Sequence, residues 1–366
     1  MTTTTTPPAK TSAPIDNTLT TGILPKPVPW LLLAMSWIVV GSIFVILMVA
    51  GVNETFNVVG TIFFGTVLFV IVNYVISRAY EGARPATNRL VTSLVTLAFI
   101  IALLPLISLL FTTISNGIPR FDVAFFTQSM RNVVGEGGGA LHAIIGTLEI
   151  TGMATLISVP VGLLTAIYLV EYGRGRLAAA ITFLVDVMTG IPSIVAGLFA
   201  FAFFALVLQE PGIRFGFGGS VALAVLMIPV VVRSSEEILK LVPNELREAS
   251  YALGVPKWLT IVKVVLPTSV AGITTGVMLA ISRVIGETAP LLIIAGFTQS
   301  VNYNLFDERM MTLPVFVYTQ YANQGIPAEA YLDRAWAGAL TLVLIVMVLN
   351  LIARIVAKVF SPKLGR

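Results

Sequence analysis

The feature that most constrains this chain is a series of long apolar segments, each of about the length that crosses a bilayer. A membrane-spanning helix needs about 20 consecutive, mainly apolar residues. We expect eight such spans, and several are longer than the bilayer requires, which predicts tilt or kinks. They lie at about residues 29–50, 58–77, 90–113, 142–170, 178–208, 219–239, 268–297 and 336–359. The sequence therefore predicts an all-α, polytopic membrane protein.

Composition supports the membrane assignment and removes several classes of site. Hydrophobic residues make up 57% of the 366 residues and charged residues only 11%, against roughly 25% in a soluble domain. Because the chain has no cysteine and a single histidine, His142, we expect no disulfide, no thiolate site and no histidine metal cluster. His142 is expected at the outer membrane interface. No catalytic or metal-binding residue is predicted.

The basic residues predict how the chain is oriented. Eight spans place both termini on the same side of the membrane, and 16 of the 22 Lys and Arg residues fall on that side. The opposite side has five, and Arg283 lies within a span. The positive-inside rule therefore predicts that both termini are cytoplasmic. Two long loops, at about 114–141 and 298–335, are then external, and the glycine run at 135–139 is expected to be a flexible hinge.

A polar segment between the sixth and seventh spans interrupts the apolar pattern on the cytoplasmic side. A short helix is expected from Asn244, because Pro243 suits a first helical turn and Glu245 and Glu248 favour a helix N-terminus. Gly254 follows the last apolar-periodic residue and is expected to end the helix. The segment is a helix outside the bilayer that another protein can bind.

The same segment contains a second amphipathic stretch and two small residues. The stretch begins at Lys257 and is expected to end at Leu266 and Pro267. Ala249 and Ser250, near the middle of the first helix, are small enough to let another surface approach closely.

The spacing across this segment resembles the EAA loop of binding-protein-dependent ABC permeases. Glu, Ala and Ser are followed by three residues, Gly, nine residues, Val, one residue and Leu-Pro; Ser and Val replace the Ala and Ile of the family form. In that family the loop docks into a groove on the ATP-binding subunit. The resemblance implies that ATPase coupling uses Glu245, Glu248, Ala249, Ser250, Gly254, Val264, Leu266 and Pro267.

Further motifs resemble the PstA-type phosphate permeases within that family. The main one is the AISRVIGETAPLL stretch at 280–292. The resemblance covers about residues 88–359 and implies the permease core of an ABC type I importer for inorganic phosphate. Shorter matching stretches lie at 145–147, 168–172, 190–197, 230–237, 313–318 and 335–338.

Four regions are expected along the chain. Residues 1–27 are rich in Thr and Pro and are predicted to form a disordered cytoplasmic tail, because they cannot bury enough apolar surface to fold. Residues 28–88 form an extra pair of spans outside the resemblance. The permease core occupies 89–360, with the coupling loop at 243–267, and a short cytoplasmic tail follows at 361–366.

The resemblance also implies partners. The chain lacks a Gly-x-x-x-x-Gly-Lys-Ser/Thr phosphate loop, so it is not expected to hydrolyse ATP or to be an enzyme. ATP and Mg²⁺ would be used by a dimer of a separate ATP-binding subunit, and this chain binds no cofactor itself. A second homologous, PstC-like permease and an external phosphate-binding protein complete the expected assembly in the plasma membrane. Lipid surrounds it, and no nucleic-acid partner is expected.

Two arginines are the candidate residues of the substrate pathway. Arg283 is placed near the middle of the seventh span, where an arginine costs about 2.5–3.5 kcal/mol, and Glu287 is four residues on, on the same helical face. The two can neutralise each other, or Arg283 can bind an oxyanion through its forked donors while Glu287 orients it. The resemblance favours the second interpretation. Arg233, at the inner end of the sixth span, is either a further pathway residue or a snorkelling side chain.

Three alternatives to phosphate import by an ABC permease remain open from the residues. Another oxyanion, such as sulfate or molybdate, fits a forked arginine equally well. A proton-coupled secondary transporter could use the intramembrane carboxylates Glu149, Asp186 and Glu287 as a relay, although Asp186 could instead pair with an arginine of a neighbouring span. A membrane enzyme is the third, and it lacks a recognisable nucleophile and base.

Overall fold

The computed structural model describes residues 24–25, 27–52 and 55–360, and throughout that part the regular elements are helices. The predicted tail at 361–366 lies outside the described residues, as does nearly all of the predicted tail at 1–27. The all-α class is confirmed. The chain divides into two compact units, Met1–Leu109 and Leu110–Arg366, and helix α3 (Ala83–Gly117) runs from the first into the second. The domain boundaries predicted from the resemblance stay predictions.

The first unit is a hairpin of two apolar helices, α1 (Val28–Val49) and α2 (Val58–Tyr80), followed by the first part of α3. Gly65 lets the two helices approach closely, since a Cβ there would lie 2.5 Å from the Trp37 ring. The Trp37 indole donates a hydrogen bond to the Thr66 hydroxyl at 3.1 Å. One polar contact therefore fixes the register of an otherwise apolar pair.

Glu81 holds the polar turn between α2 and α3. Its carboxylate accepts two hydrogen bonds of 2.7 Å from the Arg89 guanidinium, one from the Ser77 hydroxyl and one from the Leu24 amide. Arg89 lowers the pKa of Glu81 to about 2; burial opposes this, and the Ser77 and Leu24 bonds add to it. The turn therefore keeps an ionised, buried carboxylate at neutral pH.

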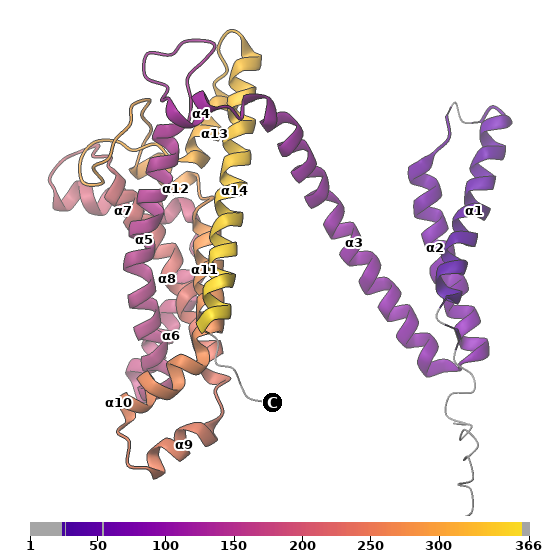
Figure 1. Cartoon of the computed structure of the whole chain (residues 1–366), viewed down its shortest axis with the longest axis horizontal. Helices are drawn as coiled ribbons and strands as arrows, with labels where there is room; N and C mark the ends of the chain where they lie inside the picture. The colour runs from indigo at the N-terminus through magenta and orange to yellow at the C-terminus, as the bar shows by residue number, and fades with distance from the viewer. Residues whose placement is uncertain (1–23, 26, 53–54, 361–366) are drawn as a thin grey trace, which may run out of the picture. The chain divides into compact units, whose positions relative to one another are not determined.

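The second unit is a helix bundle built around α8 (Gly216–Lys240), the most deeply buried of the long helices. Helix α8 packs against α5 (Leu141–Ile167), α11 (Leu266–Val284) and the bent pair of α6 (Gly175–Thr189) and α7 (Ser193–Val207). Helix α14 (Ala328–Phe360) packs against α11. Close approach needs a small residue in α5: a Cβ at Gly162 would meet the Val231 side chain at 2.7 Å. Figure 1 shows α5, α8, α11 and α14 running side by side.

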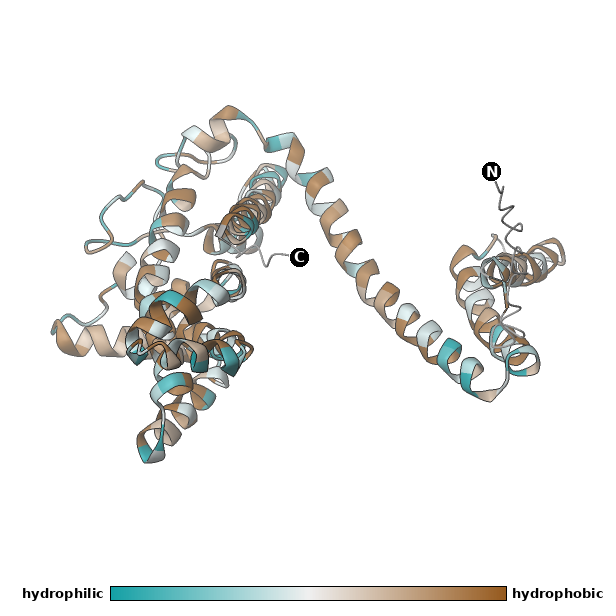
Figure 2. Cartoon of the chain, turned by 60° about the horizontal axis from the view of Figure 1, so that its bottom comes forward, coloured by the Kyte–Doolittle hydropathy of each residue, from teal (hydrophilic) through white to brown (hydrophobic). Residues whose placement is uncertain are grey.

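The two ends of this bundle have different elements. Helices α9 (Asn244–Ala252) and α10 (Lys257–Thr260) lie at one end, while α4 (Val123–Thr127) and α13 (Leu313–Ala322) lie at the other (Figure 1). The coupling segment and the two long loops thus fall on opposite ends, as the predicted topology requires. The hydropathy colouring in Figure 2 is brown along the middle of α3, with teal residues gathered near its ends. This is the pattern of a helix that crosses a bilayer.

Seven helices of the described residues are long and apolar enough to span a membrane, or eight if a bent pair counts as one span. The span predicted at 178–208 is sharply bent. It consists of α6 (Gly175–Thr189) and α7 (Ser193–Val207), which meet at 109°. Pro192 explains the break, because it has an extended backbone conformation (ψ 137°) and proline disfavours a helical residue before it.

Two predicted boundaries near the coupling segment also need correction. Pro267 does not end a helix, because α10, the π-helical turn η3 (Ile261–Val265) and α11 form one continuous span from Lys257 to Val284. The wider π turn lies directly before Pro267, where it can accommodate a ring that clashes with a regular α-helical turn. The span predicted at 268–297 stops early: α11 ends at Val284, and the short α12 (Ala289–Ile294) follows a break.

Candidate functional site: a docking helix and two arginines

Helix α9 forms as the sequence predicts. Pro243 precedes its first residue with an extended conformation, and Gly254 follows it with φ +73°, a left-handed conformation that suits glycine. Glu245, Glu248 and Ala249 are exposed. The outer face of α9 therefore offers two carboxylates beside a small residue, and no other element of the described residues covers them.

Ser250 is the exception among the predicted docking residues. It is buried, and its hydroxyl lies 2.8 Å from that of Thr260 in α10. Of the two small residues, only Ala249 is exposed, because the helix turns Ser250 toward α10; a role of Ser250 in ATPase coupling stays a prediction. Val264 and Leu266 are half-buried in the continuous span that follows. Ser250 therefore holds the two arms of the coupling segment together.

Arg247, which the motif comparison passed over, anchors α9 to the bundle. Its guanidinium is 3.0 Å from the Glu171 carboxylate and donates to the backbone carbonyls of Leu239 and Val242. Glu171 lies in η2 (Tyr168–Tyr172), a π-helical turn that continues α5. No local pattern joins residues 76 positions apart, so sequence spacing could not have identified this pair.

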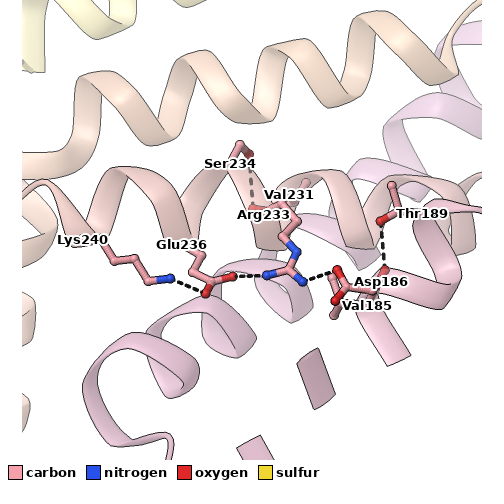
Figure 3. A network of polar contacts seen from close by, with 8 residues as sticks. All are labelled: Val185, Asp186, Thr189, Val231, Arg233, Ser234, Glu236 and Lys240. Atoms are coloured by element: carbon pink, nitrogen blue, oxygen red, sulfur yellow. Dashed lines mark hydrogen bonds and ion pairs between the residues drawn. The ribbon is translucent and has the colours of Figure 1, made fainter. Parts of the chain in front are cut away.

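Arg233 lies in a network of charges between α6 and α8, shown in Figure 3. Its guanidinium forms an ion pair with Asp186 of α6 and a second one, at 2.9 Å, with Glu236 one turn along α8. Lys240 also contacts Glu236, at 2.7 Å. Of the two roles that the sequence left open for Asp186, the structure has the pairing with an arginine of a neighbouring span. Glu236 was not predicted, although its i+3 spacing from Arg233 was a usable signal.

Arg283 has a different environment. It is exposed in the last turn of α11 and, within the described residues, forms neither an ion pair nor a side-chain hydrogen bond. Glu287 lies beyond the end of α11, in the break before α12, so the prediction that it shares a helical face with Arg283 is wrong. The i,i+4 rule fails because the helix stops between the two residues. Of the two readings of this pair, mutual neutralisation receives no support from the contacts.

Two further polar residues of α5 lie inside the bundle. His142, in the first turn of α5, is buried with its ring 5.6 Å from the ring of Phe316, and its place at the outer membrane interface stays a prediction. Glu149 is half-buried, and one of its carboxylate oxygens is buried without a hydrogen-bond partner among the described residues. Glu149 is thus brought into contact with neither arginine of the pathway.

The glycine run at 135–139 is not the flexible hinge that the sequence suggested. The fully buried Arg334 of α14 donates to the carbonyls of Gly135 and Gly137 at 2.7 and 3.0 Å and to the Gln320 side chain at 3.0 Å. Arg120 donates to the Gly138 carbonyl. Two arginines therefore fix the glycine loop to the end of the bundle opposite α9.

The fold and these charges define a multi-span membrane protein with ionised groups among its spans, a combination that marks transport pathways. Residues 158–366 match the family of binding-protein-dependent transport system inner membrane components. A "Phosphate transport system permease protein PstA 1" from Mycobacterium tuberculosis (strain ATCC 25618 / H37Rv) is 45% identical over 287 residues, which cover 77% of this chain and 91% of the relative.

Two other relatives show the same level of similarity. A "Phosphate transport system permease protein PstA" from Mycobacterium leprae (strain TN) is 46% identical over 76% of this chain and 91% of its own. One from Haemophilus influenzae is 41% identical over 74% of this chain and 94% of its own. The chain belongs to the family of binding-protein-dependent transport system inner membrane components, and the predicted resemblance is confirmed. Membership implies an ATP-binding subunit and a substrate-binding protein as partners.

Proposed function

We propose that this chain is the membrane-spanning subunit of an ATP-driven importer of inorganic phosphate and forms half of its translocation pathway. The observation that carries the proposal is the 40–46% identity, over nine-tenths of their length, with permeases named for phosphate transport. Family membership supports the transport mode, because a binding-protein-dependent permease takes its substrate from a separate protein.

The two arginines supply the chemistry that an oxyanion needs. A guanidinium presents forked donors that match the oxygens of phosphate. Arg283, with no counter-ion among the described residues, is the residue that binds phosphate within the pathway, and Glu287 limits the positive charge near it. Arg233 receives the anion nearer the α9 end and releases it when Asp186 and Glu236 reclaim the guanidinium. The three residues Arg283, Glu287 and Arg233 make up the proposed path.

The energy for transport comes from a partner that binds α9. The exposed face with Glu245, Glu248 and Ala249 docks into an ATP-binding subunit dimer, which binds ATP and Mg²⁺ and performs the hydrolysis; this chain has no ATPase activity of its own. The basic residues support a topology in which both termini and α9 are cytoplasmic. ATP binding closes the dimer and moves α9, which opens the path outward, and hydrolysis returns it inward.

Two more partners complete the importer. A homologous, PstC-like permease forms the other half of the pathway, and an external phosphate-binding protein docks on the loops at 114–141 and 298–335. The anchored glycine run supports this placement, because arginines hold that loop in a defined shape for a partner to bind.

The test is anion uptake by proteoliposomes that contain the chain copurified with its native partners. We expect uptake of phosphate that depends on internal ATP and on the phosphate-binding protein, with sulfate and molybdate carried at background rates. A preference for sulfate or molybdate would contradict phosphate as the substrate, while the assignment as an ATP-driven permease would stand. Phosphate uptake driven by a pH gradient in the absence of the ATP-binding subunit would contradict the proposal and favour a secondary transporter.

A further inference from the structure

Among the described residues, Arg247 is the one side chain of α9 that bonds to α8 and to the turn that continues α5. Arg247 donates from Nε to the Glu171 carboxylate at 3.0 Å, from Nη2 to the Leu239 carbonyl at 3.0 Å and from Nη1 to the Val242 carbonyl at 2.6 Å. The other side-chain bond from α9 to another helix, that of Ser250, reaches Thr260 of α10, at the start of the span Lys257–Val284. A displacement of α9 therefore reaches α5 and α8 through Arg247, whereas Ser250 passes it to α11; the short covalent connections at the two ends of α9 add to both routes.

The partners of Arg247 lie at the ends of two different helices. Leu239 is in the last turn of α8, where carbonyl groups have no partner within the helix, so the guanidinium acts as a cap. Glu171 lies in η2, directly after the last residue of α5. Helices α5 and α8 pack along one another through the bundle. One guanidinium thus joins α9 to the adjacent ends of the helix pair that forms the centre of the unit.

Glu171 is held a second time from the other arm of the coupling segment. Lys257, the first residue of α10, donates to the backbone carbonyl of Glu171, and its ammonium lies 4.7 Å from the centre of the Tyr172 ring. Arg247 of α9 binds the carboxylate of Glu171, and Lys257 of α10 binds its backbone carbonyl. A movement of either α9 or α10 is therefore passed to the π turn η2.

The burial of the pair favours a firm connection over a surface contact. The side chain of Glu171 is 5% exposed and that of Arg247 is 12% exposed. Exposed ion pairs exchange readily with water and contribute little, whereas a desolvated pair with additional hydrogen bonds is costly to separate. Arg233 lies in α8, two turns before Leu239, so movement of the α8 end also moves a residue of the proposed pathway.

We propose that Glu171 and Arg247 are positioning residues that transmit the displacement of α9 to α5 and α8, and so couple ATP hydrolysis to the opening of the pathway. This inference rests on the proposed function, since it presumes that an ATP-binding subunit moves α9. It assigns the family-like stretch at 168–172 a role in force transmission, separate from substrate binding and from docking.

The experiment uses the complete importer in proteoliposomes and measures phosphate carried per ATP hydrolysed. The variants are Glu171→Gln, Arg247→Gln and the two combined; the matched controls are Glu237→Gln and Arg174→Gln, whose exposed parent residues form no ion pair within the described residues. For a coupling free energy of the usual size, the ratio should fall about 10-fold in each single variant. Assembly and the ATPase rate should stay within about twofold. Because the pair acts as one unit, the double variant should resemble Arg247→Gln alone.

The Glu171–Arg247 pair in its proposed role as a transmitter of movement is called the clamp. The outcomes separate the clamp from a purely structural role of the pair and from the proposed function of the chain. Equal loss of ATPase and uptake, with an unchanged ratio in the assembled fraction, would overturn the clamp. A ratio that equals that of the controls would do the same. If Arg247→Gln lowers the assembled amount, Arg247→Lys is measured as well, and it should retain the complex but recover the ratio only partly. A wild-type complex that carries no phosphate overturns the proposed function and the clamp together.

Discussion

Arg233 and Arg283 are both arginines of the proposed pathway, and their surroundings differ in kind. Arg233 contacts one carboxylate from α6 and another from its own helix, whereas Arg283 contacts none among the described residues. A guanidinium between two carboxylates is already neutralised, so the binding of a further anion adds little favourable electrostatic energy. A guanidinium without a counter-ion gains the full electrostatic interaction with the anion. In the proposed pathway Arg283 is therefore the residue that is open to an anion in this conformation, and the carboxylates close the position of Arg233.

The difference also suggests when each arginine of the proposed pathway would meet the anion. In that proposal phosphate reaches Arg233 only if Asp186 or Glu236 moves away, and Asp186 lies on α6 while Arg233 lies on α8. A relative movement of these two helices exposes the guanidinium. The position of Arg233 in α8, whose end is held by Arg247, connects this step to the docking helix.

The largest effect should come from removing the unpaired arginine. We expect Arg283→Gln to lower phosphate uptake by about 100-fold, because a hydrogen-bonded contact to a charged group contributes about 1.5–3 kcal/mol. Arg283→Lys keeps the positive charge but loses the forked donors of the guanidinium, so its uptake rate should lie between those of the wild type and Arg283→Gln. Uptake by proteoliposomes with equal amounts of complex is the measurement, and Arg354→Gln, at another exposed arginine, is the control. Unchanged uptake in Arg283→Gln would remove this residue from the pathway.

A smaller effect, partly reversible, should follow at the paired arginine. Arg233→Gln leaves Asp186 and Glu236 without their counter-ion, and we expect uptake to fall about 10-fold because breaking a pair exposes uncompensated charge. Adding Asp186→Asn should recover part of the loss, whereas the same addition to Arg283→Gln should recover nothing. Uptake of the four variants forms a double-mutant comparison. Equal rescue in both backgrounds would contradict the distinction between the two arginines.

Glu287 should matter less than its place in the motif suggests. It forms no ion pair with Arg283, so it acts only through the local field, and we expect Glu287→Gln to change phosphate uptake by no more than about threefold. The apparent affinity for phosphate in the uptake assay should rise, since a negative charge near the path is lost. A loss as large as that of Arg283→Gln would show that the two residues do form a pair during transport.

The smallest effect on transport should come from the fully paired Glu81 of the first unit. Its pKa is lowered to about 2 by Arg89, so the pair stabilises the fold above pH 4.5, and this contribution is lost as the pH falls from 4.5 through about 2. The protection factors of amides in α2 and α3, which correct the exchange rates for their intrinsic pH dependence, should therefore fall over that pH range in the wild type. Glu81→Gln should show lower protection factors at pH 7 and no further change from this group. Wild-type protection factors that are identical at pH 7 and pH 3 would contradict the stabilising role.

The spans and the docking helix could be predicted because their signals are local. About 20 apolar residues define a span wherever they occur, and Pro243 and Gly254 mark the limits of α9 within 12 residues of one another. The pairing of Asp186 with an arginine was also within reach, since a carboxylate among spans needs a counter-ion. These features depend on composition and short-range spacing.

The features that could not be predicted depend on where helices break or which side chains meet. Hydropathy is the same on both sides of the break after Val284, so it could not show that Glu287 leaves the face of Arg283. Ala249 and Ser250 are both small residues of one motif, so the sequence could not show that Ala249 is exposed and Ser250 is buried. The contacts of Arg247 with Glu171 and of Arg334 with the glycine run join residues 76 and almost 200 positions apart. Only the packed bundle determines them.

The most direct test of the account is the ATPase rate of the purified complex, because it reports on the docking helix and on substrate together. We predict that phosphate-loaded binding protein raises the rate several-fold while the unloaded protein does not, an effect of the usual size for coupling between sites. Ala249→Arg, which places a long side chain on the exposed face of α9, should abolish the response. A rate that is the same with and without phosphate, or a full response in Ala249→Arg, would contradict the account.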